Sequence, residues 1–111
     1  MTNPTDLNRE LAEALDWKYK GNVIHENAAG MLSMLTDDND QFANLVYFRP
    51  STDKAQAMDL LIEFRLSVWA HANGDWCVTR RILGNDITVK GSTPMEAITR
   101  AVIKSLESEN V

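Results

Sequence analysis

The 111-residue chain is 44% hydrophobic and 24% charged, which is typical of one globular domain, and we assign residues 1–111 to it. Its net charge of −5 disfavours direct binding to a nucleic-acid backbone and suits a basic protein surface. The single cysteine excludes an internal disulfide and favours the cytoplasm, and the sequence has neither a signal peptide nor an apolar run of the roughly 20 residues that span a membrane.

The first element predicted along the chain is a helix over residues 7 to about 16. Asp6 or Thr5 can cap this helix, and apolar residues recur on one of its faces. Trp17 and Tyr19 follow directly, and we expect their rings to pack over the end of the helix.

The next stretch carries weaker patterns. Residues 23–25 are predicted as a short strand, whereas residues 28–35 suit either one short helix or an irregular apolar flap. Residues 36–40 form an acidic loop. Residues 45–48 have strand composition and stop before Pro50, because the residue before a proline disfavours helix.

Two later helices carry clearer signals. Ser51-Thr52-Asp53 opens one that is predicted to run to about Arg65, since apolar residues recur at helical spacing after it. The last helix begins after Thr93, which can cap it, with Pro94 at the first helical position and Glu96 completing a capping box.

Three strands are predicted between these helices, and two turns set how they pair. Asn73-Gly74 and Gly84-Asn85 each indicate a two-residue hairpin loop. The opposed residues would then be Ala72–Asp75, His71–Trp76, Ala70–Cys77, Trp69–Val78, Ile82–Ile87 and Arg80–Val89.

Opposed residues share a face of a sheet, and both predicted faces carry apolar side chains. One face would hold Trp69, His71, Trp76, Val78, Ile82, Ile87 and Val89. The other would hold Leu66, Val68, Ala70, Cys77 and Thr79. We therefore expect a mixed α/β fold of the α+β type. It would be a three-layer α/β/α sandwich, with helices on both faces of a small antiparallel sheet.

The sequence offers one nucleophile–base pair, Cys77 with His71. The predicted hairpin places them on opposite faces, so Cys77 is interpreted as a buried structural cysteine and His71 as a packing partner of Trp76. His25 alone is not a zinc site, and the loop at 37–40 lacks the glycine and closing glutamate of a calcium-binding EF-hand. We expect no catalytic residue, no cofactor and no metal.

Charged residues instead suggest a surface for interaction. Asp37, Asp38 and Asp40 lie in the acidic loop, while Arg81 and Lys90 could form a small basic patch at a sheet edge. The alternative is an ordinary solvated surface.

Three segments resemble the small phage family called the phage ABA-sandwich domain. They are Leu-Asn-Arg-x-x-Ala-x-Ala-Leu-x-Trp at residues 7–17, Ser-Thr-Asp at residues 51–53, and Ala-Ile-x-x-Ala at residues 97–101. The resemblance implies a phage-encoded α/β/α sandwich and assigns no activity and no site residue.

A second resemblance is confined to one helix entry. Gly91-Ser92-Thr93-Pro94-Met95-Glu96-Ala97 is similar to the Gly-x-Thr-x-x-Glu-Ala segment of HicB-type antitoxins, although the strand-borne Pro-Gly segment of that family is missing upstream. The order of elements after Ser51 also matches a double-stranded-RNA-binding domain. The last helix lacks the lysine-rich start that such a domain requires, so that comparison is rejected.

Charge and resemblance together predict a protein-interaction module that binds or inhibits a host protein in the host cytoplasm. A basic nucleic-acid-handling or defence complex, as for an anti-CRISPR protein, would be a fitting target. One alternative is a HicB-like antitoxin or regulatory module. Another is an unrecognised small-ligand binder that uses the His71–Trp76 face.

Overall fold

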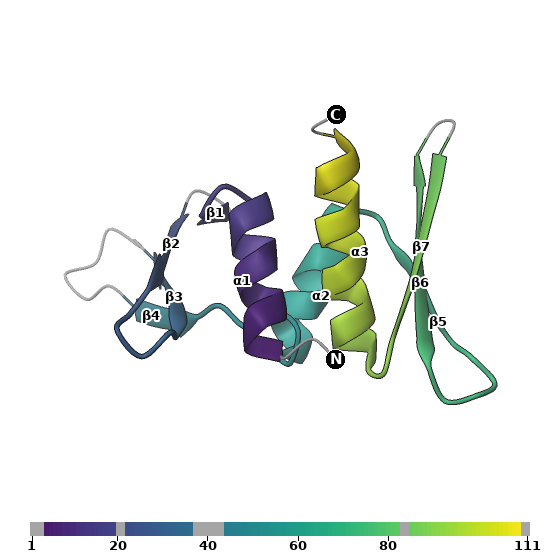
Figure 1. Ribbon diagram of the computed structural model, residues 1–111, viewed down its shortest axis with the longest axis horizontal. Helices are drawn as coiled ribbons and strands as arrows, with labels where there is room; N and C mark the ends of the chain where they lie inside the picture. Colours follow the sequence, from purple (N-terminus) through teal and green to yellow (C-terminus); the bar gives the residue numbers. More distant parts are fainter. Residues whose placement is uncertain (1–3, 20–21, 37–43, 83–84, 110–111) are drawn as a thin grey trace.

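The computed structural model describes residues 4–19, 22–36, 44–82 and 85–109. Helices and strands follow one another as shown in Figure 1. In chain order they are α1 (Pro4–Ala14), β1 (Lys18–Tyr19), β2 (Asn22–Glu26), β3 (Leu32–Thr36), β4 (Asn44–Tyr47), α2 (Lys54–Glu63), β5 (Ser67–Ala70), β6 (Trp76–Ile82), β7 (Asn85–Gly91) and α3 (Pro94–Glu109).

The helices lie between two antiparallel sheets (Figure 1). One sheet has the order β1-β2-β3-β4 and the other β5-β6-β7. Helix α3 packs on β6 and β7 on one side and contacts α1 and α2 on the other. The predicted α+β sandwich with a small antiparallel sheet is confirmed. The order of its layers is sheet, helices, sheet, which differs from the expected helix, sheet, helix.

The first sheet explains this difference. Residues 28–35, predicted as a helix or flap, instead make a turn followed by β3, because the Asn27 side chain accepts hydrogen bonds from the backbone N–H groups of Ala29 and Met31. Gly30 supplies a φ of 83° in that turn, which favours glycine. The strands predicted at 23–25 and 45–48 are confirmed as β2 and β4. They pair on either side of β3, and the resulting sheet forms the outer layer beside α1 (Figure 1).

Helix α1 begins three residues before the predicted position, with Pro4 at its first residue. Leu7 and Leu11 are buried in a core shared by both sheets. The helix ends where Asp16 and Trp17 take φ values of 59° and 58°, and the Trp17 N–H bonds back to the carbonyl of Ala12. Trp17 is partly buried against the core, and Tyr19 is buried with its ring 6.0 Å from that of Phe48.

Helix α2 is confirmed at nearly its predicted bounds. Asp53 caps it, with its carboxylate accepting a hydrogen bond from the Gln56 N–H at 3.0 Å. Leu60 is buried, whereas Met58 and Ile62 are exposed. The chain leaves the helix through Arg65, whose φ is 53°.

The β5–β6 loop is one residue longer than predicted. His71 and Asp75 close the hairpin through a hydrogen bond from the His71 N–H to the Asp75 carbonyl at 2.7 Å. The side chain of Asn73 accepts from the Asp75 N–H within the loop, and Gly74 has a φ of 96°. This is the geometry of a three-residue hairpin with glycine in the left-handed position.

The extra residue shifts the β5–β6 register by one, which corrects the predicted faces. Trp69, not Ala70, lies opposite Cys77, and Ala70, not His71, lies opposite Trp76. Val68 therefore joins Val78 on the face that packs on the helices, while Trp69 moves to the outer face with Cys77. A shift of the pairing register by one residue moves the side chains of a strand to the opposite face of the sheet.

The β6–β7 pairing is shifted by two residues from the prediction, which leaves the faces unchanged. Val78 lies opposite Val89 and Arg80 opposite Ile87, on the face toward the helices. The Arg80 guanidinium stacks over the ring of Phe64 at the end of α2, 5.2 Å from its centroid. The outer face of this sheet has no helix over it in Figure 1.

Helix α3 starts as the capping pattern predicts, with one change of partner. The Thr93 hydroxyl accepts from the Glu96 N–H, but the Glu96 carboxylate accepts from the N–H and hydroxyl of Ser92. A Cβ added at Gly91 would meet the backbone N of Ala97 at 2.7 Å, so this strand end must be glycine to lie against the helix.

Candidate functional site

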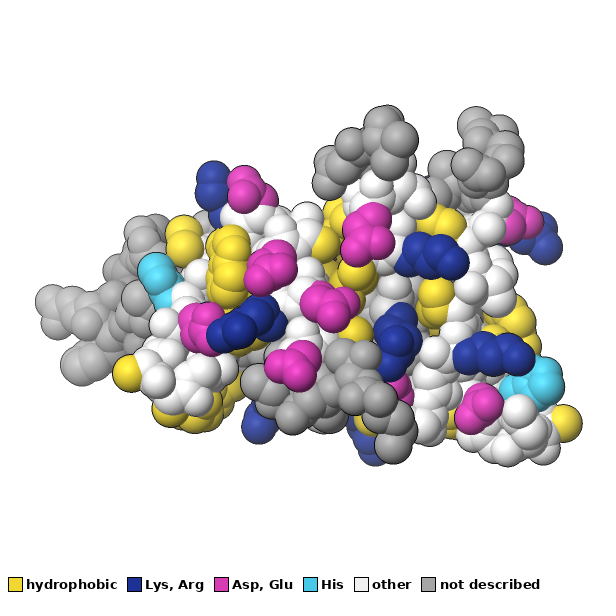
Figure 2. All heavy atoms as spheres, viewed as in Figure 1, with side chains coloured by type: hydrophobic (Ala, Val, Ile, Leu, Met, Phe, Trp, Pro, Cys, Tyr) yellow, Lys and Arg dark blue, Asp and Glu magenta, His cyan; other side chains and the backbone are white. Residues whose placement is uncertain are grey.

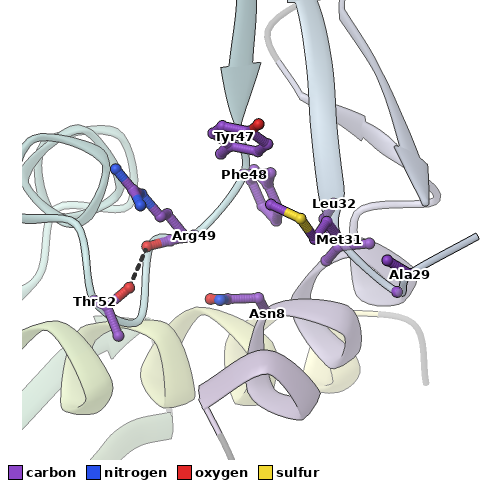
Figure 3. Close-up of a pocket in the computed structure, with 9 residues that line it drawn as sticks. Asn8, Ala29, Met31, Leu32, Tyr47, Phe48, Arg49 and Thr52 are labelled. Atoms are coloured by element: carbon purple, nitrogen blue, oxygen red, sulfur yellow. Dashed lines mark hydrogen bonds between the residues drawn. The ribbon is translucent and has the colours of Figure 1, made fainter. Parts of the chain in front are cut away.

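A hollow of about 300 Å³ opens between the first sheet and the helices (Figure 3). The turn before β3, the end of β4, α1 and the segment before α2 contribute to it. Its apolar walls include Met31, Tyr47 and Phe48. Phe48 is buried, but Met31 and Tyr47 are 45% and 42% exposed, so apolar surface is open to solvent here.

Asn8 supplies the polar floor of this pocket. Only 6% of the residue is exposed, and its Oδ1 accepts a hydrogen bond from the Ser51 N–H at 3.0 Å. Its side chain extends from α1 into the pocket (Figure 3). The side-chain amide of Asn8 also carries N–H donors, and a ligand carbonyl or carboxylate could accept from them.

Hydrogen bonds hold the rim of the pocket in place. The Arg49 N–H donates to Gln56 Oε1 at 2.8 Å, and the Gln56 amide donates to the carbonyl of Tyr47. The Arg49 guanidinium lies 3.8 Å from the Asp53 carboxylate, which offsets part of its charge. Across the rim, the Thr52 hydroxyl donates to the Arg49 carbonyl at 3.4 Å (Figure 3).

The residues that line the pocket determine which groups it could accommodate. Its described lining combines apolar walls with the amide of Asn8 and the partly compensated charge of Arg49, and includes neither a histidine nor a cysteine nor a carboxylate. Such a lining suits an apolar side chain with a neighbouring hydrogen-bond acceptor.

The sequence patterns do not indicate this pocket. The apolar run at 28–35 suits a helix or a flap, so it does not predict that Met31 and Leu32 lie near Tyr47 in a sheet. The available signal was Asn8, a polar residue on the same helical face as Leu11 and Ala12.

The predicted charged surface is described only in part. Asp37, Asp38 and Asp40 lie outside the described residues. Arg81 and Lys90 share the outer face of the second sheet but do not stand side by side, since Arg81 lies opposite Asp86 and Lys90 opposite Cys77. Between these pairs, the hydroxyls of Thr79 and Thr88 are 3.2 Å apart.

Cys77 is a buried structural cysteine, as predicted, with 3% of the residue exposed. Its cross-strand neighbours are Trp69 and Lys90. His71 lies in the exposed loop, where its Nδ1 is 3.1 Å from the Asn73 Oδ1. No hydrogen bond joins His71 to Cys77 within the described part of the chain, and the predicted His71–Trp76 face does not exist.

Two further findings concern titratable groups and membranes. Burial raises the pKa of the Tyr19 hydroxyl, and the nearby carboxylates of Glu63 and Asp59 raise it further.

No group of three histidine, cysteine or acidic residues that could hold a metal is found among residues 4–19, 22–36, 44–82 and 85–109. Over the same ranges, no helix has the length and apolar character needed to cross a membrane.

Comparison with known proteins gives a shared fold. No protein-family model matches the chain, and no curated protein matches it. Among solved structures, it is similar to a phage protein from Bacillus cereus ATCC 14579. The two are 15% identical, with a TM-score of 0.64 over 96% of this chain and 90% of that one. At this identity the likeness is one of fold.

Proposed function

We propose that this chain is a phage-encoded protein of the ABA-sandwich type that binds a host protein and blocks it. The pocket around Asn8, Met31 and Tyr47 carries this proposal, because it combines exposed apolar side chains with the amide of the buried residue Asn8. The shared fold with a phage protein supports the phage origin.

The partner inserts one apolar side chain between Met31 and Tyr47, and a carbonyl or carboxylate beside that side chain accepts from Asn8. Interfaces commonly depend on a few buried anchors of this kind, surrounded by weaker contacts. The net charge of −5 favours a partner with a basic surface, such as a nucleic-acid-handling or defence complex.

The test is capture from bacterial lysate with three forms of the tagged protein, quantified by mass spectrometry. Met31→Glu places a charge at the pocket mouth, whereas Met58→Glu places one on the exposed side of α2, where Met58 is 52% exposed. We expect the wild type and Met58→Glu to recover the same protein, and Met31→Glu to recover about 30-fold less.

Equal recovery by Met31→Glu and the wild type would show that the pocket is not the binding site. Recovery of no protein above background by any form would contradict the proposed function itself. A basic partner further predicts that recovery falls as salt rises, because salt screens exposed charges.

A further inference from the structure

The outward edge of β7 is a strand edge with no partner in the described chain. The second sheet has the order β5-β6-β7, so β7 pairs with β6 on one side only. No backbone hydrogen bond links the other edge of Asn85–Gly91 to any described residue. Free edges of this kind pair readily with another strand.

The sequence of β7 is complementary to itself in one antiparallel register. In a two-fold pairing centred on Thr88, Asp86 lies opposite Lys90 of the second copy, and Ile87 opposite Val89. In such a pairing, directly opposed residues share a face and lie close enough to interact. Centring the pair on Ile87 or Val89 instead separates Asp86 from Lys90.

The faces of the sheet agree with this register. Asp86, Thr88 and Lys90 lie on the outer face, while Ile87 and Val89 face the helices. A two-fold axis perpendicular to the sheet keeps those faces, so charged residues would meet charged ones and apolar residues apolar ones. Neither Asp86 nor Lys90 forms an ion pair with any described residue.

The surface beside β7 is hollowed. A hollow of about 490 Å³ runs between β7, α1 and α3, with Leu7, Val89 and Ile103 among its lining. Val89 is only partly buried there. Lysine and arginine side chains gather over α3 and the adjoining sheet on the face drawn in Figure 2.

We propose that two copies of this chain associate through β7, forming one continuous antiparallel sheet across a two-fold axis centred on Thr88. Its contacts are two Asp86–Lys90 pairs, two Ile87–Val89 pairs and the backbone ladder. The pocket at Asn8 lies on the other side of the helical layer, so the dimer would present two such pockets.

The first test measures self-association by sedimentation over a wide range of concentration. Asp86→Lys or Lys90→Asp alone creates like-charge pairs and is expected to raise the dissociation constant about ten-fold. The double variant Asp86→Lys/Lys90→Asp restores opposite charges and is expected to return to the wild-type value. Lys54→Asp, a charge change on α2, should leave it unchanged.

The second test locates the axis. In a Cys77→Ala background, Thr88→Cys places two thiols opposite each other at a separation that a disulfide can span. We expect oxidation to give a covalent dimer with Thr88→Cys and little with Ser67→Cys, which lies on the opposite edge strand β5. A wild type that remains monomeric at all concentrations, a dimer without rescue in the double variant, or equal cross-linking at both positions would overturn the proposal.

Discussion

At the scale of single residues, the carboxylate of Glu96 holds the start of α3 in place through several interactions. Glu96 accepts from the Ser92 N–H and hydroxyl and pairs with Arg100 at 2.9 Å. The sequence predicted Thr93 and Glu96 as a reciprocal pair, and the return bond goes to Ser92 because the strand end brings that residue within reach. The spacing of a capping box identifies where the helix starts but not every hydrogen-bond partner of the capping side chains.

The pKa of Glu96 yields a pH-dependent prediction. The hydrogen bond from Ser92 lowers this pKa, desolvation partly opposes the shift, and Arg100 lowers it further. A carboxyl whose folded-state pKa is depressed adds stability above its unfolded pKa, which is about 4.3, and that stability is lost as pH falls through the folded-state value.

We expect Glu96→Gln to cost about 1 kcal/mol in the free energy of unfolding at neutral pH. The difference from the wild type should disappear in acid. Urea unfolding over a pH series measures this, with Glu107→Gln at the exposed end of α3 as the control. A cost that stays constant with pH would exclude the carboxylate as its cause.

Gly91 is a second residue with a definite structural requirement. Gly91→Ala places a Cβ 2.7 Å from the backbone N of Ala97, and backbone cannot move aside as a flexible side chain can. We expect a loss of about 1–3 kcal/mol, as for overpacked sites. Gly74→Asn is the control, since no atom lies within 4 Å and asparagine tolerates a positive φ. Equal unfolding midpoints for the two variants would contradict the close approach.

At the scale of elements, helices were predictable and sheet registers were not. Residues 54–63 and 94–109 form helices near their predicted bounds because caps and apolar spacing are local signals. The Asn73-Gly74 turn was also found, but the two-residue and three-residue loops share that dipeptide. In the structure, the bond from the His71 N–H to the Asp75 carbonyl closes a three-residue loop, and the Asn73 side chain accepts from the Asp75 N–H within it. The faces of β5 depend on that difference.

The prediction of a helix or flap at residues 28–35 was wrong for a related reason. Its apolar residues give no clear period, and the turn depends on hydrogen bonds to Asn27 and a left-handed Gly30. Because this segment forms one wall of the pocket, the error also concealed the candidate site.

The two faces of α2 should differ sharply in their response to truncation. Leu60 is 1% exposed and Ile62 is 65% exposed, two residues apart on the same helix. We expect Leu60→Ala to cost about 2–5 kcal/mol through the cavity that it leaves. Ile62→Ala should change stability by less than about 0.5 kcal/mol. Chemical denaturation measures both, and a large effect of Ile62→Ala in the isolated chain would mean that this face is covered.

At the scale of the whole molecule, the layers could not be read from the sequence because the first sheet was not anticipated. Because both faces of the second sheet carry apolar residues, the sequence predicts helices on both of its faces. In the structure, the outer face carries Trp69 beside a buried Cys77 together with hydroxyl and charged side chains. The helices instead bury apolar side chains toward both sheets, which gives one core for the described part of the chain.

That shared core is the claim on which the placement of the pocket and the strand edge depends, and single-tryptophan variants test it directly. Trp69→Phe/Trp76→Phe leaves Trp17 beside the first sheet, and Trp17→Phe/Trp69→Phe leaves Trp76 in the second. In each variant, urea unfolding followed by fluorescence is compared with the same variant's far-ultraviolet circular dichroism. One core predicts that the two signals coincide in both variants. A Trp17 fluorescence transition at lower urea than the loss of secondary structure would contradict it, because the first sheet would then unfold separately from the rest.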